Sequence, residues 1–273
     1  MSQIIKPEPL VMGGKAFYTL SSYDPVEIEV DVPQILDAEI ELAVANMVEN
    51  AGGSTADLAD DAWVAEHFEG VKNADELRAN LRANLQFLNM RVVEEQKMHL
   101  AVEKLAERLG QSVPEAQLES MRARLRFSFA QDAAQAGMSE EEYLARIGLT
   151  REAFEASLEK QARAAAEQEA ALSAYASEKK LKVADEEVGA SLGLSPERTE
   201  QIIDEAKEAG QFEYLRDAAL ISKAAGAVVA ECSCTYKHET PAEAERRFAA
   251  IKAMVAAEKA ADAKKEGPDL KLV

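Results

Sequence analysis

The feature that most constrains the fold is the stretch from Asn73 to Leu109, which contains neither glycine nor proline. Its apolar residues recur every three or four positions, as Leu77, Leu81, Leu85, Leu88 and Val92 and then as Met98, Val102, Leu105 and Leu109. This spacing places the side chains on one face of an α-helix. At ~1.5 Å per residue, one helix over the stretch is roughly 55 Å long. The sequence therefore predicts a long helix with an apolar seam for partner helices.

Start and stop signals divide most of the remaining chain into further helices. Asn73 with Glu76, and Ser139 with Glu142, have the residue types and spacing of capping boxes. Thr150 is a typical cap for a helix that reaches about Glu178. Glycines that typically end helices stand at positions 110, 137 and 148. These signals predict helices almost throughout residues 56–226.

Two short stretches outside this region predict strands. Apolar residues alternate with acidic ones at Val26, Ile28, Val30 and Val32. A second strand is predicted from Val228 and Val229 through the alternating Cys232, Cys234 and Tyr236. Two isolated strands need each other or a helical surface, so we expect them near each other. The fold class is therefore mainly α, with one or two short strands.

Charge and composition exclude several classes of protein. The chain has 50 acidic and 31 basic side chains and a formal net charge of -19. This excess argues against nucleic-acid binding, which needs a basic surface. It also argues against docking of the protein on an anionic membrane. Residues 1–7 lack the basic start and apolar run of a secretory signal. Two cysteines make no disulfide framework, and the expected location is the cytoplasm.

Chemical motifs of common enzymes are missing from the sequence. It has no glycine-rich phosphate loop, no Gly-x-Ser-x-Gly elbow and no His-Glu-x-x-His pattern. One constellation is a weak candidate for a metal site, because Cys232, Cys234 and His238 could supply three zinc ligands. Their spacing is not that of a common zinc module, no fourth ligand is obvious, and two small buried cysteines in a strand are the better interpretation. No cofactor and no catalytic residue are predicted.

Aromatic and long apolar residues gather on the predicted long helices. Core packing explains most of them, but slender helices have much surface and little core, so some apolar residues must stay exposed. Exposed apolar patches mark interaction sites. The candidate binding residues are Phe87, Met90, Met121, Leu125, Phe127, Phe129, Tyr143, Leu144 and Phe154.

The order of these elements resembles the C-terminal, substrate-holding domain of bacterial trigger factor. A more distant resemblance is to the helical domain of periplasmic chaperones of the survival-protein type. The similarity covers about Asp57 to Glu243, and a linker strand at Ser22–Ile28 also matches. The segments that carry it are Asp60–Phe68, Asn73–Arg78, Val113–Glu119, Gly137–Leu144, Gly148–Phe154, Ala174–Ala176 and Leu181–Val188.

The resemblance implies long helical arms and a division into three parts. Residues 1–53 are expected to form a linker strand and a short helix packed on the helical body. Residues 54–243 are expected to form the helical chaperone domain with its arms. Residues 244–273 are expected to form a C-terminal helix with a frayed tail, because the stretch from Met254 to Lys265 has few apolar anchors.

The resemblance also implies a holdase that binds unfolded or nascent polypeptides in an apolar helical cradle and assists protein folding and transport. The family's aromatic-rich isomerase domain and its Gly-Phe-Arg ribosome-docking loop have no counterpart in this sequence. We therefore expect neither prolyl isomerisation nor ribosome docking. The alternatives are a structural or assembly protein that clasps one partner or a second copy of itself, and an isomerase by family label only.

Overall fold

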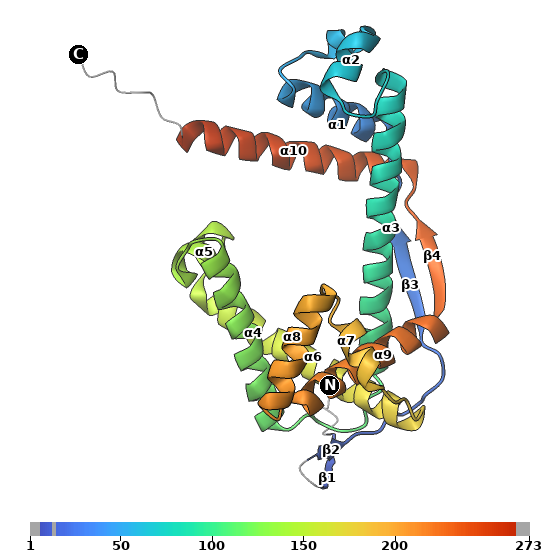
Figure 1. Ribbon diagram of the computed structural model, residues 1–273, viewed down its shortest axis with the longest axis vertical. Coiled ribbons are helices and arrows are strands. Elements are labelled where there is room, and N and C mark those ends of the chain that lie inside the picture. Colours follow the sequence, from blue (N-terminus) through green and yellow to red (C-terminus); the bar gives the residue numbers. More distant parts are fainter. Residues whose placement is uncertain (1–5, 13–14, 266–273) are drawn as a thin grey trace, which may run out of the picture. The chain divides into compact units, whose positions relative to one another are not determined.

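The computed structural model describes residues 6–12 and 15–265, and helices dominate them (Figure 1). The mainly α fold predicted from the sequence is thereby confirmed. Contacts divide the chain into two compact units. Of the described residues, unit 1 contains 6–12, 15–28 and 97–234, and unit 2 contains 29–96 and 235–265. The predicted boundaries at 53 and 243 are not among the breaks between these units.

Three elements contain a break between the units. They are helix α3 (Ala74–Ala106) and the strands β3 (Glu27–Val32) and β4 (Ser233–His238), which form a two-stranded sheet. The N–H of Ser233 donates to the carbonyl of Val26, and the N–H of Glu239 donates to the carbonyl of Val32. The sequence offset is the same at both ends, so β3 and β4 run parallel.

The N-terminal part of unit 1 is held at the end of α3. Strands β1 (Leu10–Met12) and β2 (Lys15–Phe17) form an antiparallel hairpin in which Leu10 faces Phe17. Leu20 makes a β-bridge with Leu109, which follows α3. The guanidinium of Arg108 donates to the backbone carbonyls of Ser22, Asp24 and Pro25. Arg108 therefore satisfies three carbonyls of a segment that has no regular structure.

The rest of unit 1 is helical. Helices α4 (Glu115–Gln135), α5 (Glu140–Arg146) and α6 (Arg151–Glu178) follow one another, with α4 packed on α6. Helix α6 also packs on α9 (Phe212–Glu231), which in turn contacts α7 (Asp185–Ser191) and α8 (Pro196–Glu208). Ser139 accepts from the N–H of Glu142 and Thr150 accepts from that of Ala153, which confirms both predicted caps.

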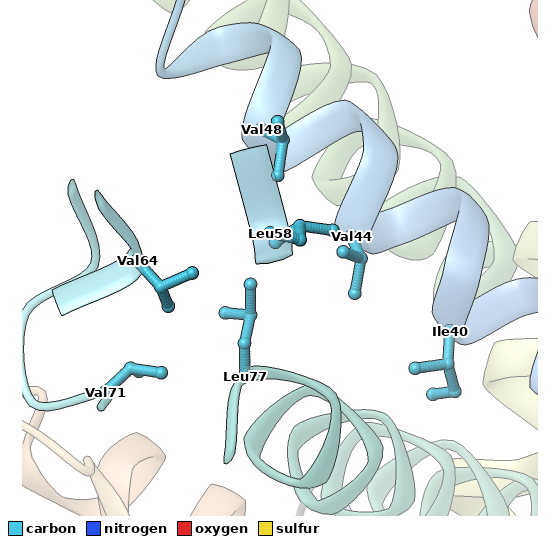
Figure 2. Packing of buried hydrophobic residues seen from close by; sticks show 7 residues of the cluster. All are labelled: Ile40, Val44, Val48, Leu58, Val64, Val71 and Leu77. Carbon is cyan, nitrogen blue, oxygen red and sulfur yellow. The ribbon is translucent and has the colours of Figure 1, made fainter. Parts of the chain in front are cut away.

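The N-terminal part of unit 2 is a small helical head made of α1 (Asp37–Asn50), η1 (Thr55–Ala59), α2 (Asp61–His67) and the start of α3. Figure 2 shows its core, in which large aliphatic side chains of these elements point toward one another. The core consists of Ile40, Val44, Val48, Leu58, Val64, Val71 and Leu77. Asn73 caps α3 by accepting from the N–H of Glu76 at 2.9 Å, as the sequence predicts.

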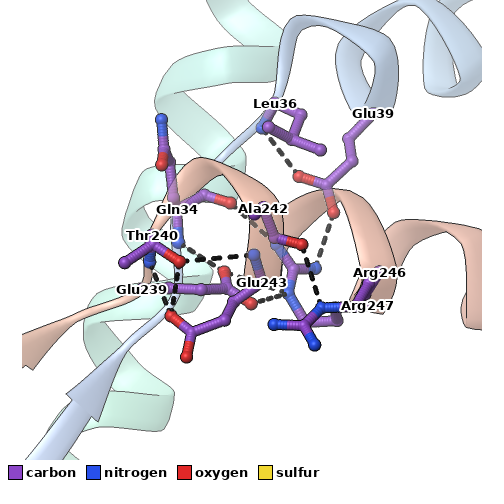
Figure 3. Close-up of polar contacts among 9 residues, drawn as sticks. All are labelled: Gln34, Leu36, Glu39, Glu239, Thr240, Ala242, Glu243, Arg246 and Arg247. Atoms are coloured by element: carbon purple, nitrogen blue, oxygen red, sulfur yellow. Dashed lines mark hydrogen bonds and ion pairs between the residues drawn. The ribbon is translucent and has the colours of Figure 1, made fainter.

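Helix α10 (Pro241–Lys265) is fixed to the head by one arginine, shown in Figure 3. Arg247 donates through Nε to Glu239, through Nη1 to Glu39 at 2.6 Å, and through Nη2 to the carbonyl of Gln34 at 2.7 Å. Thr240 caps the helix and bonds with Glu243 in both directions. The start of α10 is therefore fixed by polar contacts.

The local structure departs from the sequence analysis in two places. Val228 and Val229 lie in α9, so the predicted strand start is wrong, and β4 begins only at Ser233. The hairpin β1–β2 was not predicted. The stretch 254–265 belongs to helix α10, and its fraying stays a prediction. Residues 1–5, used to infer the absence of a secretory signal, and the end of the predicted tail at 266–273 lie outside the described residues.

Candidate polypeptide-binding surfaces

The arm, defined here as α4–α5–α6, is built with little apolar volume. The buried face of α6 is mostly alanine, at positions 162, 166, 170, 171, 174 and 176. Alanine lets helices approach closely but contributes little buried area. Ion pairs between α4 and α6 supplement this packing, with Arg122 to Glu159, Arg124 to Glu169 and Arg126 to Glu155 at 2.5, 2.7 and 2.5 Å. The packing of the arm therefore relies on small side chains and on ion pairs.

A small aromatic core holds the arm where α5 meets α4 and α6. Leu144, Phe154 and Leu158 are buried there, and Leu125 and Phe129 pack against them. The ring centroid of Phe129 lies 4.3 Å from that of Phe154 and 5.4 Å from that of Tyr143. Five of the residues predicted as candidates for binding therefore pack against one another here: Leu125, Phe129, Tyr143, Leu144 and Phe154. Met121, only 7% exposed, is also a core residue.

Phe127 differs from its neighbours on α4. Its side chain is 65% exposed, although Leu125 and Phe129 on the same helix pack inward. Ile147 and Leu149, which follow α5, are also exposed. Phe127 is therefore the most exposed of these three apolar side chains of the arm.

Unit 2 exposes a second set of apolar side chains on α3. Phe87 and Met90, both predicted as candidates, are 60% and 66% exposed. Leu88 and Val92 are exposed as well, although the sequence analysis placed them only in the apolar seam. Along the seam, Leu77 is buried, Leu81 and Leu85 are half-buried, and Leu88 and Val92 are exposed. The periodicity was visible in the sequence, whereas the point where burial ends was not.

The head also contains a hollow of about 430 Å³. Its apolar lining comes from α1, α3 and the segment after α2, and consists of Met47, Phe68, Val71, Leu77 and Leu81. Polar groups of His67, Glu69, Asn80 and Asn84 complete it. Next to it, Trp63 stacks on His67 with centroids 4.2 Å apart and meets Phe68 edge-on. The sequence analysis missed this hollow, because its residues come from segments separated by turns.

Charges on the arm and the adjacent helices serve mainly to hold helices in place. Hydrogen bonds to Glu115 and then Glu159 raise the pKa of Arg122 above its ordinary value. The backbone N–H and hydroxyl of Ser139 lower the pKa of Glu142, which closes the cap of α5. The ammonium of Lys179, 2.7 Å from Glu231, lowers the pKa of that carboxyl and ties α6 to α9.

The weak metal candidates are not brought together. Cys232 follows α9 and donates to the carbonyl of Val229, and Cys234 and His238 lie in β4. Within residues 6–12 and 15–265, no group of three or more histidine, cysteine or carboxylate side chains is placed to hold a metal ion. The same part of the chain contains no helix with the length and apolarity that crossing a bilayer requires.

These features define a class: a mainly helical protein with a helical arm and uncovered apolar side chains. The family model described as the C-terminus of bacterial trigger factor protein matches residues 73–230, and the chain belongs to this family. The trigger factor of Macrococcus caseolyticus is 27% identical over 173 residues, 63% of this chain and 40% of that protein. The trigger factor of Halalkalibacterium halodurans is 26% identical over 148 residues, 54% of this chain and 34% of that protein.

The chain thus spans well under half the length of these curated relatives. One solved structure, that of the hypothetical Mycoplasma protein MPN555, aligns with 81% of this chain and 90% of its own. The sequence identity is 16% and the TM-score is 0.42, a value that does not establish a shared fold.

Proposed function

We propose that this protein is a chaperone that holds unfolded polypeptides against exposed apolar side chains. The observation that carries the proposal is the exposure of Phe127 on the arm and of Phe87 and Met90 on α3. Membership in the trigger factor family supports the same role. The clients are unfolded or nascent polypeptides. Such chains expose their own apolar residues, so binding buries apolar surface on both partners and is favourable.

The expected binding is weak and reversible. A client that buries ~400 Å² of apolar surface gains roughly 10 kcal/mol at the usual coefficient. Association costs about 4–15 kcal/mol because the two molecules lose translational and rotational freedom, so little net affinity remains. Methionine and unbranched side chains adapt to many sequences. A surface of this kind can hold and release many clients, as a holdase must.

The test is aggregation of a chemically denatured reporter enzyme, followed by light scattering. The wild-type protein in several-fold molar excess is expected to suppress the scattering, and the triple variant Phe87→Gln, Met90→Gln and Phe127→Gln to lose most of this effect. A matched control carries Gln86→Ala and Ser128→Ala, two exposed polar positions beside the candidates. Equal suppression by both variants, or none by the wild type, would contradict the proposal.

The same experiment separates the chaperone from an assembly protein. A protein that clasps one partner forms a stoichiometric complex with it and leaves the reporter to aggregate. A chaperone suppresses the aggregation of several unrelated reporters with comparable efficiency. Suppression limited to one reporter would therefore favour the alternative.

A further inference from the structure

The two cysteines of the chain lie two residues apart, where α9 ends and β4 begins (Figure 1). They are the only cysteines in the sequence, and neither is in a disulfide. Cys232 directly follows α9, and Cys234 is the second residue of β4. Both side chains are half-buried, so a small reagent in solution can reach them. The feature is therefore a pair of accessible thiols that are close in the chain.

This pair is too small a set for a metal site, but it suits a reaction between two sulfur atoms. Cys232 has extended backbone angles, with a φ of -63° and a ψ of 144°. In an extended chain, side chains two residues apart face the same way. His238, the third candidate ligand of the sequence analysis, is four residues beyond Cys234 and thus ~13 Å further along the strand. The two thiols therefore share a face, whereas the imidazole is too distant to join them.

The spacing of the two cysteines lies at the edge of what a disulfide tolerates. Residues two apart in a strand have Cα atoms ~6.6–6.8 Å apart. Disulfides usually have Cα separations of about 4.4–6.8 Å and Cβ separations of about 3.5–4.5 Å. The Cα atoms are thus near the long limit, and the Cβ atoms must approach by ~2–3 Å. A disulfide between Cys232 and Cys234 therefore requires the chain to bend at Ser233.

Few contacts oppose a bend at Ser233. Its side chain is exposed, and its backbone N–H donates to the carbonyl of Val26 at 2.8 Å, at the end of the β3–β4 sheet. The thiol of Cys232 donates to the carbonyl of Val229, a weak hydrogen bond that loss of the thiol proton also removes. The bend therefore breaks one backbone hydrogen bond at the end of the sheet.

We propose that Cys232 and Cys234 form a redox-active dithiol, which closes to an intramolecular disulfide by exchange with low-molecular-weight disulfides and thereby opens the end of the β3–β4 sheet. Strained and exposed disulfides are more easily reduced than structural ones, so an excess of reduced thiol reopens the pair. The break between unit 1 and unit 2 falls directly after Cys234, so the opened hydrogen bond lies beside this break. The proposal does not depend on chaperone activity.

The exchange consists of two substitutions at sulfur, written here for glutathione disulfide. One protein thiolate attacks a sulfur of glutathione disulfide, forms a mixed disulfide and expels one glutathione thiolate. The second protein thiolate attacks the protein sulfur of the mixed disulfide and expels the other glutathione. The protein loses two electrons and two protons, and glutathione disulfide gains them to become two thiols. Because a single residue separates the cysteines, the second step is intramolecular and proceeds at high effective concentration.

The test equilibrates the full chain with increasing ratios of oxidised to reduced glutathione, alkylates the remaining thiols and measures the intact mass. The wild type is expected to pass from two alkylated thiols to none, with little bound glutathione. Ser233→Ala, which keeps both thiols and the backbone N–H, should behave in the same way. Cys232→Ser and Cys234→Ser should each accumulate roughly fivefold more glutathione adduct, because the second substitution is lost.

Three outcomes of this titration would overturn the proposal. The wild type could accumulate as much glutathione adduct as the single variants, which would mean that the second thiol does not attack. It could keep both thiols at every glutathione ratio, which would mean that the pair is not redox-active. It could form disulfide-linked dimers, which would mean that the two thiols react with another copy rather than with each other.

Hydrogen exchange tests the opening of the sheet, because one protein contains both the affected amide and its control. On oxidation, the amide of Ser233 is expected to exchange roughly tenfold faster, since its bond to Val26 is lost. The amide of Glu239 donates to Val32 at the other end of the sheet and should change less than about twofold. Equal exchange at Ser233 in the oxidised and reduced proteins would overturn the coupling of the disulfide to the sheet.

Discussion

The head and the arm are held together by different means. The head packs large aliphatic side chains from four elements into one core. In the arm, the buried face of α6 is mostly alanine, ion pairs link α4 to α6, and the larger apolar residues gather in one small cluster. A core of isoleucine, leucine and valine stabilises through buried area, whereas an alanine interface needs close contact and contributes less. The arm therefore relies less on large aliphatic side chains, and Phe127 lies outside its small core.

The largest expected effect is in the head. Ile40 is 1% exposed in the head core, and Ile40→Ala should lower the free energy of unfolding by about 3 kcal/mol through lost burial and the cavity left behind. Phe127→Ala on the arm removes a larger side chain and should cost under about 0.5 kcal/mol, because that side chain is mostly exposed. Urea unfolding followed by circular dichroism measures both. A larger cost at Phe127 would mean that this residue belongs to a core.

Arg247 should give an intermediate effect that depends on pH. Arg247→Met removes the donor to Glu239, Glu39 and Gln34, and should cost about 2 kcal/mol at pH 7. Burial alone raises the pKa of Glu239, but hydrogen bonds from Arg247 and from the N–H of Gln34 outweigh it and leave the pKa below its ordinary value. A lowered pKa contributes stability above the unfolded-state pKa of about 4.3, and this is lost as the pH falls through the folded-state pKa.

The difference between wild type and Arg247→Met should therefore be largest above about pH 5 and shrink below about pH 4. The measurement is the urea midpoint over this range. The adjacent Arg246, also drawn in Figure 3, is exposed and donates to the carbonyl of Ala242 in its own helix. Arg246→Met is thus a matched control, with little effect expected at any pH. A difference for Arg247→Met that stays constant with pH would rule out Glu239 as the titrating partner.

The sequence predicted helices and their caps better than it predicted strands and exposure. Caps are local, so the pairs Asn73–Glu76 and Ser139–Glu142 sufficed to place two helix starts. The β-branched Val228 and Val229 suggested a strand, but they lie near the end of the long helix α9, whose context outweighs their propensity. The hairpin β1–β2 was not predicted, because each of its strands has only three residues. Gly13 and Gly14 between them were interpreted only as residues that break helices.

The candidate binding residues illustrate what the sequence could not decide. Met121, Phe127 and Phe129 lie on one helix, yet only Phe127 is exposed, since burial depends on where α5 and α6 pack. On α3, the seam reads the same along its length, but it is covered at Leu77 and uncovered at Val92. Periodicity identifies the face of a helix, whereas the tertiary partner determines how far along that face is buried.

The smallest expected effect concerns the ion pairs that supplement the arm. Arg126 and Glu155 lie 2.5 Å apart, but their side chains are 49% and 41% exposed. Solvent screens such a pair, so a double-mutant cycle of Arg126→Gln and Glu155→Gln should give a coupling of about 0.5 kcal/mol that falls in high salt. The cycle is measured by urea unfolding at low and high salt. A coupling near 2 kcal/mol that resists salt would mean that ion pairs hold the arm as firmly as aliphatic packing holds the head, and the contrast between the two regions would disappear.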